Sequence, residues 1–259
     1  MRIAIKTQLS YAIPAPCSLL LQIEAAEVPH QTVETSDLNV SSAVEWNIIN
    51  GDDGVGQRRW GSFTDMFDCT YIATVRVDRP AVTLDALAAI PITALPADVT
   101  PYLMPSRYCH PEAFFTFVPM QFGEAKGGVL VTQMADWIGT HFTYDNAAST
   151  AATTATDSFH AMAGVCRDYA HVLIAMARSV GIPARMASVY APDVTPQDFH
   201  AVVEVYLDGA WHLIDPTGMA QPDQMVMIGV GRDAADVSFM TSYGQMDLLM
   251  QEVQVSGLP

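Results

Sequence analysis

Residues 164–185 read GVCRDYAHVLIAMARSVGIPAR, and this stretch decides the fold of the second half of the chain. Apolar residues recur along it at the spacing of one helix face, namely Val165, Tyr169, Val172, Leu173, Met176 and Val180. Arg167, His171 and Arg178 fall on another face. Gly181 ends the predicted helix, and Pro183 prevents it from resuming. Cys166 therefore lies in the first turn of a long helix.

The first turn of a helix suits a reactive cysteine. Its backbone N–H groups have no partner within the helix, and the helix dipole favours an anion there. A thiolate is such an anion, so this position favours the nucleophilic form of Cys166. Free cysteines are also common core residues, so the placement alone leaves both roles open.

A second stretch, DFHAVVEVYLDGAWHLIDPTG at 198–218, predicts a β-hairpin with Asp208-Gly209 as its two-residue turn. Counting back from this turn places His200 and Asp215 on the same face of the two strands. They are then diagonal cross-strand neighbours, roughly 7–8 Å apart. An imidazole and a carboxylate can form a hydrogen bond across that separation.

The same count excludes two other candidates. Glu204 shares the face but lies four residues along the strand from His200, roughly 13 Å away at the usual rise. His212 points to the opposite face. The alternative for the selected pair is a surface histidine and an Asp-Pro turn. Together with Cys166, however, the pair gives the cysteine, histidine and acid of nucleophilic catalysis, which favours a functional role.

The first half of the chain has the period-two pattern of β-strands. Apolar residues fall on odd positions in RIAIKTQLSYAI at 2–13 and in FDCTYIATVRVDR at 67–79. Between them, GDDGVG at 51–56 is typical of a turn and follows the strand-like AVEWNII at 43–49. We predict an α+β protein with an N-terminal antiparallel β-sandwich over 1–95, a proline-rich connector over 96–125 and a catalytic unit over 126–259.

In the catalytic unit we expect a helix over 129–142, a short helix over 154–163 and strands over 185–191, 200–207 and 210–215. The connector contains Cys109 next to His110, which invites a catalytic interpretation. Neighbours in an extended chain point in opposite directions, so a structural role is favoured for this pair.

Composition limits the function further. The chain of 259 residues carries a net charge of −16, which argues against nucleic acid or an anionic membrane as a partner. No window reaches the roughly 18 apolar residues of a membrane span. The four cysteines are scattered without a C-x-x-C pair, which favours a reducing, cytoplasmic location. They are Cys17, Cys69, Cys109 and Cys166.

These two stretches, with GRDAADV at 231–237, resemble the catalytic motifs of the bacterial transglutaminase-like superfamily, a papain-like group of cysteine enzymes. YLMPSRYC at 102–109 and the strand-rich start resemble the N-terminal region of its bacterial members. The resemblance implies a nucleophile helix packed on an antiparallel sheet. It also implies Cys166 as nucleophile, His200 as general base and Asp215 as the acid that orients it.

Five further residues are candidates for lining or supporting the cleft: Tyr144, Asp168, Asp198, Arg232 and Asp233. We expect no cofactor and no metal; His171 with His160 and Cys166 is a poor metal set. We expect hydrolysis of a peptide or amide bond in a peptide or protein substrate through a thioester. The alternatives are transfer of the acyl group to an amine, and a binding module without activity. The sequence does not indicate an oligomeric state.

Overall fold

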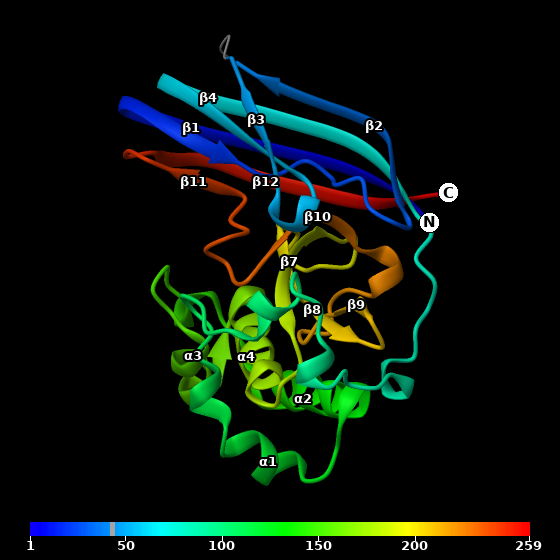
Figure 1. The fold of residues 1–259 in the computed structure, drawn as a ribbon. Coiled ribbons are helices and arrows are strands. Elements are labelled where there is room, and N and C mark those ends of the chain that lie inside the picture. Colours follow the sequence, from blue (N-terminus) through cyan, green and yellow to red (C-terminus); the bar gives the residue numbers. More distant parts are fainter. Residues whose placement is uncertain (42–44) are drawn as a thin grey trace.

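The computed structural model describes residues 1–41 and 45–259, which form two antiparallel sheets with the helices gathered around the second one (Figure 1). The antiparallel α+β class predicted from the sequence is confirmed. In the predicted strand at 43–49, residues 43 and 44 lie outside the described residues. Asn47–Asn50 form strand β3.

The large sheet is built on two long strands, β1 (Arg2–Leu21) and β4 (Gln57–Val77), with β2 (Gln31–Val40) and β3 paired to β4. β11 (Met240–Ser242) and β12 (Asp247–Leu258) both pair with β1. β1 and β4 have 20 and 21 residues, so each has different neighbours at its two ends. The strands predicted as a β-sandwich therefore form one six-stranded sheet.

The alternation read from the sequence sets the buried face of this sheet. Ile3 lies opposite Val75, and both are fully buried. The apolar residues on this face pack against Tyr190, Val226 and Ile228, which come from the second sheet. The two sheets therefore share one core.

The C-terminal strands belong to the large sheet. Val253 and Val255 on β12 are buried in its core, and the strand runs antiparallel to the first half of β1. This pairing differs from the predicted division, in which residues 126–259 formed the catalytic unit alone. Alternating apolar residues near the C-terminus need a sheet face to cover them, and β1 offers an unpaired edge.

The second sheet has the order β10-β7-β8-β9. Its strands are β7 (Ala184–Tyr190), β8 (His200–Leu207), β9 (Ala210–Ile214) and β10 (Val226–Gly231). The helices are α1 (Phe117–Phe122), α2 (Gly127–His141), α3 (Ala155–Ala161) and α4 (Cys166–Ser179). A short parallel pair joins β5 (Thr143–Tyr144) to β6 (Ala163–Gly164). Single 3-10 turns lie at Asp52–Gly54, Leu84–Ala86, Ile92–Ala94, Thr100–Leu103, Pro111–Phe114, Asn146–Ala148 and Pro222–Gln224.

Helix α4 lies at the centre of the second unit and is buried on every side over residues 168–178. Its predicted polar face is therefore not exposed. The connector covers it: the guanidinium of Arg178 donates to the Met104 carbonyl and to the Ser106 hydroxyl, each at 3.0 Å. It also donates to the Arg232 carbonyl at 2.6 Å. These bonds satisfy a buried charge that periodicity alone would assign to solvent.

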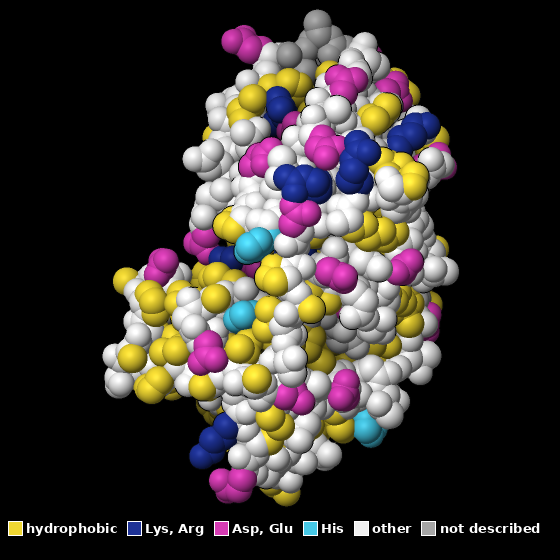
Figure 2. Space-filling view, turned by 90° about the vertical axis from the view of Figure 1, so that its right-hand side faces the viewer, with side chains coloured by type: hydrophobic (Ala, Val, Ile, Leu, Met, Phe, Trp, Pro, Cys, Tyr) yellow, Lys and Arg dark blue, Asp and Glu magenta, His cyan; other side chains and the backbone are white. Residues whose placement is uncertain are grey.

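Charged side chains are spread over the surface. On the face shown in Figure 2, Asp and Glu side chains are scattered and do not gather in one patch. Within the described part of the chain, none of the helices has the length and apolar character needed to cross a membrane.

Tyr190 links the two sheets through its hydroxyl, which donates to the Ile23 carbonyl at 2.7 Å and lies 3.2 Å from the Thr7 hydroxyl. All three residues are buried. Tyr190→Phe should lower the free energy of unfolding by about 1–3 kcal/mol, because both partners lose a buried hydrogen bond. Urea denaturation would measure this. Tyr243→Phe, at a 69% exposed tyrosine, is the matched control and should change nothing. Equal stabilities of the two variants would contradict the prediction.

Candidate active site

Cys166 is the first residue of α4, and the local sequence holds it there. The buried carboxylate of Asp168 accepts a hydrogen bond from the Val165 N–H at 2.9 Å, which caps the start of the helix. A Cβ atom at Gly164 would lie 2.6 Å from the Asp168 Cβ, so glycine is required at this close approach. Asp168 therefore holds Cys166 at the start of α4, a structural role that suits a carboxylate in a first helical turn.

The hairpin has the register predicted from its turn. Leu207 lies opposite Ala210, and Asp208 and Gly209 both have positive φ, as a two-residue turn requires. His200 begins β8, and Asp215 follows directly after β9.

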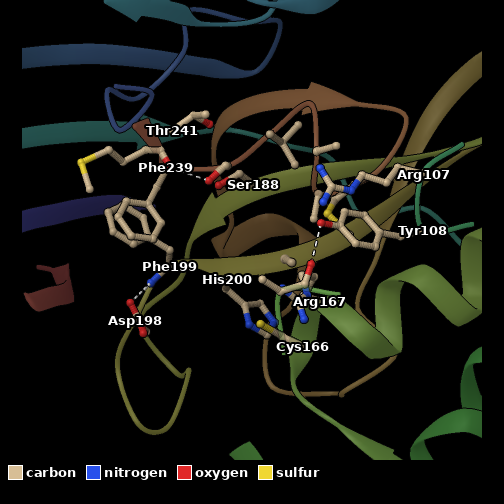
Figure 3. Close-up of a pocket in the computed structure, with 18 of the residues that line it drawn as sticks. Arg107, Tyr108, Cys166, Arg167, Ser188, Asp198, Phe199, His200, Phe239 and Thr241 are labelled. Atoms are coloured by element: carbon tan, nitrogen blue, oxygen red, sulfur yellow. Dashed lines mark hydrogen bonds between the residues drawn. The ribbon is translucent and has the colours of Figure 1, made fainter. Parts of the chain in front are cut away.

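The predicted contact across the hairpin is present. His200 Nε2 lies 2.8 Å from Asp215 Oδ2, and both side chains are buried. Since Nε2 is taken by the acid, Nδ1 is the nitrogen left for the thiol. In Figure 3 the Cys166 sulfur lies beside the His200 ring.

The carboxylate of Asp215 is fixed by its own turn. Its Oδ1 accepts from the hydroxyl of Thr217 at 2.7 Å and from the Thr217 N–H at 2.9 Å, and its Oδ2 accepts from the Ala220 N–H at 2.9 Å. Thr217 and Ala220 were not predicted as supports of Asp215 from the sequence. The available signal was the hydroxyl residue two positions after an Asp that starts a turn.

The electrostatics favour a protonated His200. Burial by itself lowers the pKa of its imidazole, but hydrogen bonds to Asp215 and to the Cys166 thiol outweigh burial and raise this pKa to about 10. Burial alone would raise the pKa of Asp215, but the hydrogen bonds from His200 and Thr217 lower it. His200 therefore holds its proton through neutral pH, between the ionised Asp215 and the Cys166 sulfur.

Cys166 and His200 line a cleft of about 510 Å³. Figure 3 shows Phe199 and Phe239 on one side of them and Arg107 and Tyr108 on the other. None of these four flanking residues was singled out as a site residue from the sequence, because they come from the loop before β8, the connector and the segment after β10.

Two predicted candidates, Tyr144 and Asp198, reach the site. Burial and the adjacent Cys166 raise the pKa of the Tyr144 hydroxyl. Asp198 lines the cleft and is exposed; its carboxylate accepts from the Gln251 amide and from the Phe199 N–H, each at 2.8 Å. Asp198 is thus both a loop cap and part of the cleft wall.

The other two candidates act behind the cleft. Asp233 is buried and accepts a hydrogen bond from the Tyr108 N–H at 2.8 Å, so it holds the connector beside α4. Arg232 forms an exposed ion pair with Asp236 at 2.9 Å. The segment 231–237 therefore orders one wall of the cleft without contacting the thiol.

Several other polar residues have partners other than Cys166 and His200. His212 contacts the Leu207 carbonyl at 3.2 Å, and Glu204 forms a buried ion pair with Arg185 at 2.8 Å. His171 is fully buried and stacks on Tyr108. Residues 1–41 and 45–259 hold no group of three or more His, Cys, Asp or Glu side chains arranged for a metal ion.

The four cysteines differ in their exposure to solvent. Cys166 is partly exposed, whereas the other three are buried, and burial raises the pKa of Cys69 and of Cys109 to about 12. Brief treatment with iodoacetamide near pH 7 should therefore alkylate Cys166 first, because thiolate character and exposure both control the reaction. Peptide mass mapping would read this out. Native-state labelling of Cys17 with Cys166 untouched would contradict it.

Comparison with known proteins agrees with this geometry. Residues 123–216, which include Cys166, His200 and Asp215, match the transglutaminase-like superfamily. The chain is 30% identical over 117 residues to an uncharacterized protein of Mycobacterium leprae, an alignment that covers 42% of this chain and 42% of that protein. A Mycobacterium tuberculosis protein is 29% identical over 123 residues, 42% of this chain and 39% of the relative. The chain thus spans less than half of these relatives.

A solved structure resembles the whole chain. It is a "putative cysteine protease" from Cytophaga hutchinsonii, with a TM-score of 0.92 and 29% identity over 100% of this chain and 91% of that one. The likeness therefore includes the large N-terminal sheet. The chain therefore contains a segment, residues 123–216, that matches the transglutaminase-like superfamily, within a fold shared with that solved structure.

Proposed function

We propose that the protein is a cysteine-dependent hydrolase of peptide or amide bonds, with Cys166 as nucleophile, His200 as acid and base, and Asp215 as orienting acid. The observation that carries the proposal is the 2.8 Å contact between His200 and Asp215 beside a partly exposed thiol in a cleft. A nucleophile, a base and a group that orients the base are what covalent acyl transfer requires.

The first half of the reaction forms a thioester. The Cys166 thiolate, whose proton resides on His200, attacks the carbonyl carbon, and the carbonyl oxygen takes up the negative charge. The Cys166 N–H and the Tyr144 hydroxyl lie together beside the thiol, so both are available to stabilise that charge. His200 then gives its proton to the leaving amine, and the C–N bond breaks. A histidine with its pKa raised to about 10 is protonated for this step at neutral pH.

The second half regenerates the enzyme. His200, now neutral, takes a proton from a water molecule, which attacks the thioester carbon and releases the acid and the Cys166 thiolate. An amine in place of water would give transglutaminase-type transfer. Transfer requires a site that aligns the amine and excludes water.

The test is a panel of peptides incubated with and without a labelled primary amine. Release of new amino termini, lost in Cys166→Ala, would support hydrolysis. If the label is incorporated in preference to hydrolysis, and this depends on Cys166, the activity is acyl transfer and the hydrolase proposal is wrong. If no peptide gives either product, the result would favour a binding module without activity.

A further inference from the structure

The two ends of the cleft differ in chemistry. Phe199 and Phe239 stack face to face at one end, with ring centroids 4.6 Å apart and planes 7° from parallel. At the other end, the Arg107 guanidinium lies 5.0 Å from the centre of the Tyr108 ring. Cys166 and His200 lie between the two ends (Figure 3). A bound chain would therefore meet an apolar surface on one side of the thiol and a cation on the other.

In the described part of the chain, Arg107 is a cation without a carboxylate partner. Of the twelve Lys and Arg residues, nine pair with carboxylates or backbone carbonyls: Arg2, Arg58, Arg59, Arg76, Arg79, Arg167, Arg178, Arg185 and Arg232. Among the described residues, Lys6, Arg107 and Lys126 make no ion pair and no side-chain hydrogen bond. Of these three, Arg107 alone lines the cleft that contains Cys166. In a chain with 28 acidic residues, an unpaired guanidinium at this place is unusual.

Tyr108, the ring beside the Arg107 guanidinium, is fixed in place by its neighbours. Tyr108 is fixed by its N–H bond to Asp233, by its hydroxyl bond to the Ala151 carbonyl at 2.9 Å, and by the stacked ring of His171 at 4.9 Å. A guanidinium stacked over an aromatic ring interacts with the ring through its own planar face. The N–H groups at the edge of the guanidinium then remain free for a bidentate acceptor.

Arg167 adds positive charge on the same ring, with its guanidinium 5.9 Å from the Tyr108 centre. Its own N–H groups bond to the Ser149 hydroxyl and the Thr150 carbonyl, at 2.7 and 2.6 Å. Arg167 therefore strengthens the local field but has fewer free donors than Arg107.

We propose that Arg107 binds a carboxylate of the substrate, so that the peptides processed carry a negative charge near the cleaved bond and an apolar side chain against Phe199 and Phe239. This rests on the proposed hydrolase function. Carboxylates fit a guanidinium fork in two parallel hydrogen bonds. The net charge of −16 opposes acidic ligands only weakly, because charges beyond a Debye length of about 8 Å are screened in physiological salt.

The carboxylate can come from a Glu or Asp side chain or from a free C-terminus, and binding to the full-length Cys166→Ala protein distinguishes the two. The probes are fluorescent heptapeptides with blocked ends in which one Phe and one Glu are separated by one to three residues. Matched peptides carry Gln in place of Glu, with a blocked or a free C-terminal carboxylate. We expect at least one carboxylate peptide to bind about tenfold more tightly than its neutral match.

Arg107→Gln in the same background should reduce this preference to about one. The matched control is Lys6→Gln, which removes an equally unpaired charge from the exposed face of β1 and should keep the preference. Equal binding of charged and neutral peptides, or a preference that survives Arg107→Gln, would overturn the assignment.

Turnover by the protein with Cys166 intact separates this inference from the proposed function. Cleavage of charged over neutral peptides, measured as kcat/KM, should follow the binding preference and depend on Arg107. If no peptide is cleaved but the carboxylate preference in binding persists and requires Arg107, the hydrolase proposal fails and the anion site stands.

Discussion

Cys166→Ala is expected to lower kcat/KM by at least about 10⁴-fold, the largest effect of any single substitution in this chain, because no thioester can form without the sulfur. The fold should be retained, since Cys166 is partly exposed at the start of α4 and its helix cap comes from Asp168. Steady-state cleavage of the best peptide, with circular dichroism on the same sample, would measure both.

Cys69→Ala is the matched control for this loss. It also removes a thiol, but from the core of the large sheet, where the side chain is buried. It should reduce stability modestly and leave turnover intact at temperatures where the protein is folded. Activity that survives Cys166→Ala would exclude Cys166 as the nucleophile.

Asp215→Asn is expected to lower kcat by about 10²–10⁴-fold, because the amide no longer stabilises the His200 imidazolium or fixes its tautomer. His200→Ala should lose at least as much activity. His212→Ala is the control on the same hairpin: the side chain lies on the opposite face and its Nε2 is 3.2 Å from the Leu207 carbonyl, so the variant should retain nearly full activity. Equal losses for the two histidine variants would contradict the assigned roles.

The same substitution has a pH signature that a merely structural role for Asp215 would not produce. The pKa of His200 is raised to about 10 in the folded protein from an ordinary value of 6.5. Asp215→Asn should shift it downward, since the carboxylate hydrogen bond and charge both favour the protonated ring. NMR titration of the His200 ring would report this. An unchanged His200 pKa in the variant would contradict it.

The pH dependence of the free energy of unfolding follows from the same shift in the His200 pKa. A group with a raised folded pKa stabilises the fold fully below its unfolded pKa, and this contribution is lost as pH rises through the folded value. The wild-type protein should therefore lose stability between about pH 6.5 and pH 10, and Asp215→Asn should lose less over that window. Urea midpoints at pH 6 and pH 10 for both proteins would measure the difference.

Local sequence patterns predicted much of this fold. Alternation predicted the buried face of β1 and of the second half of β4, and the apolar stripe predicted α4. In the hairpin, a turn of two residues determines every pair that follows, so the contact between His200 and Asp215 could be counted from the sequence. These features depend on neighbours within a few or a few tens of residues.

The rest depends on contacts between segments far apart in the chain. No local period shows that β12 pairs with β1, that the connector buries the polar face of α4, or that Arg107 faces the cleft that holds Cys166. Such contacts arise when elements with compatible apolar faces pack together, and each face alone fits several partners. The sequence by itself determined the elements and the His200–Asp215 pair. Only the tertiary structure decided which surfaces enclose the thiol, because enclosure is a property of packing between distant segments.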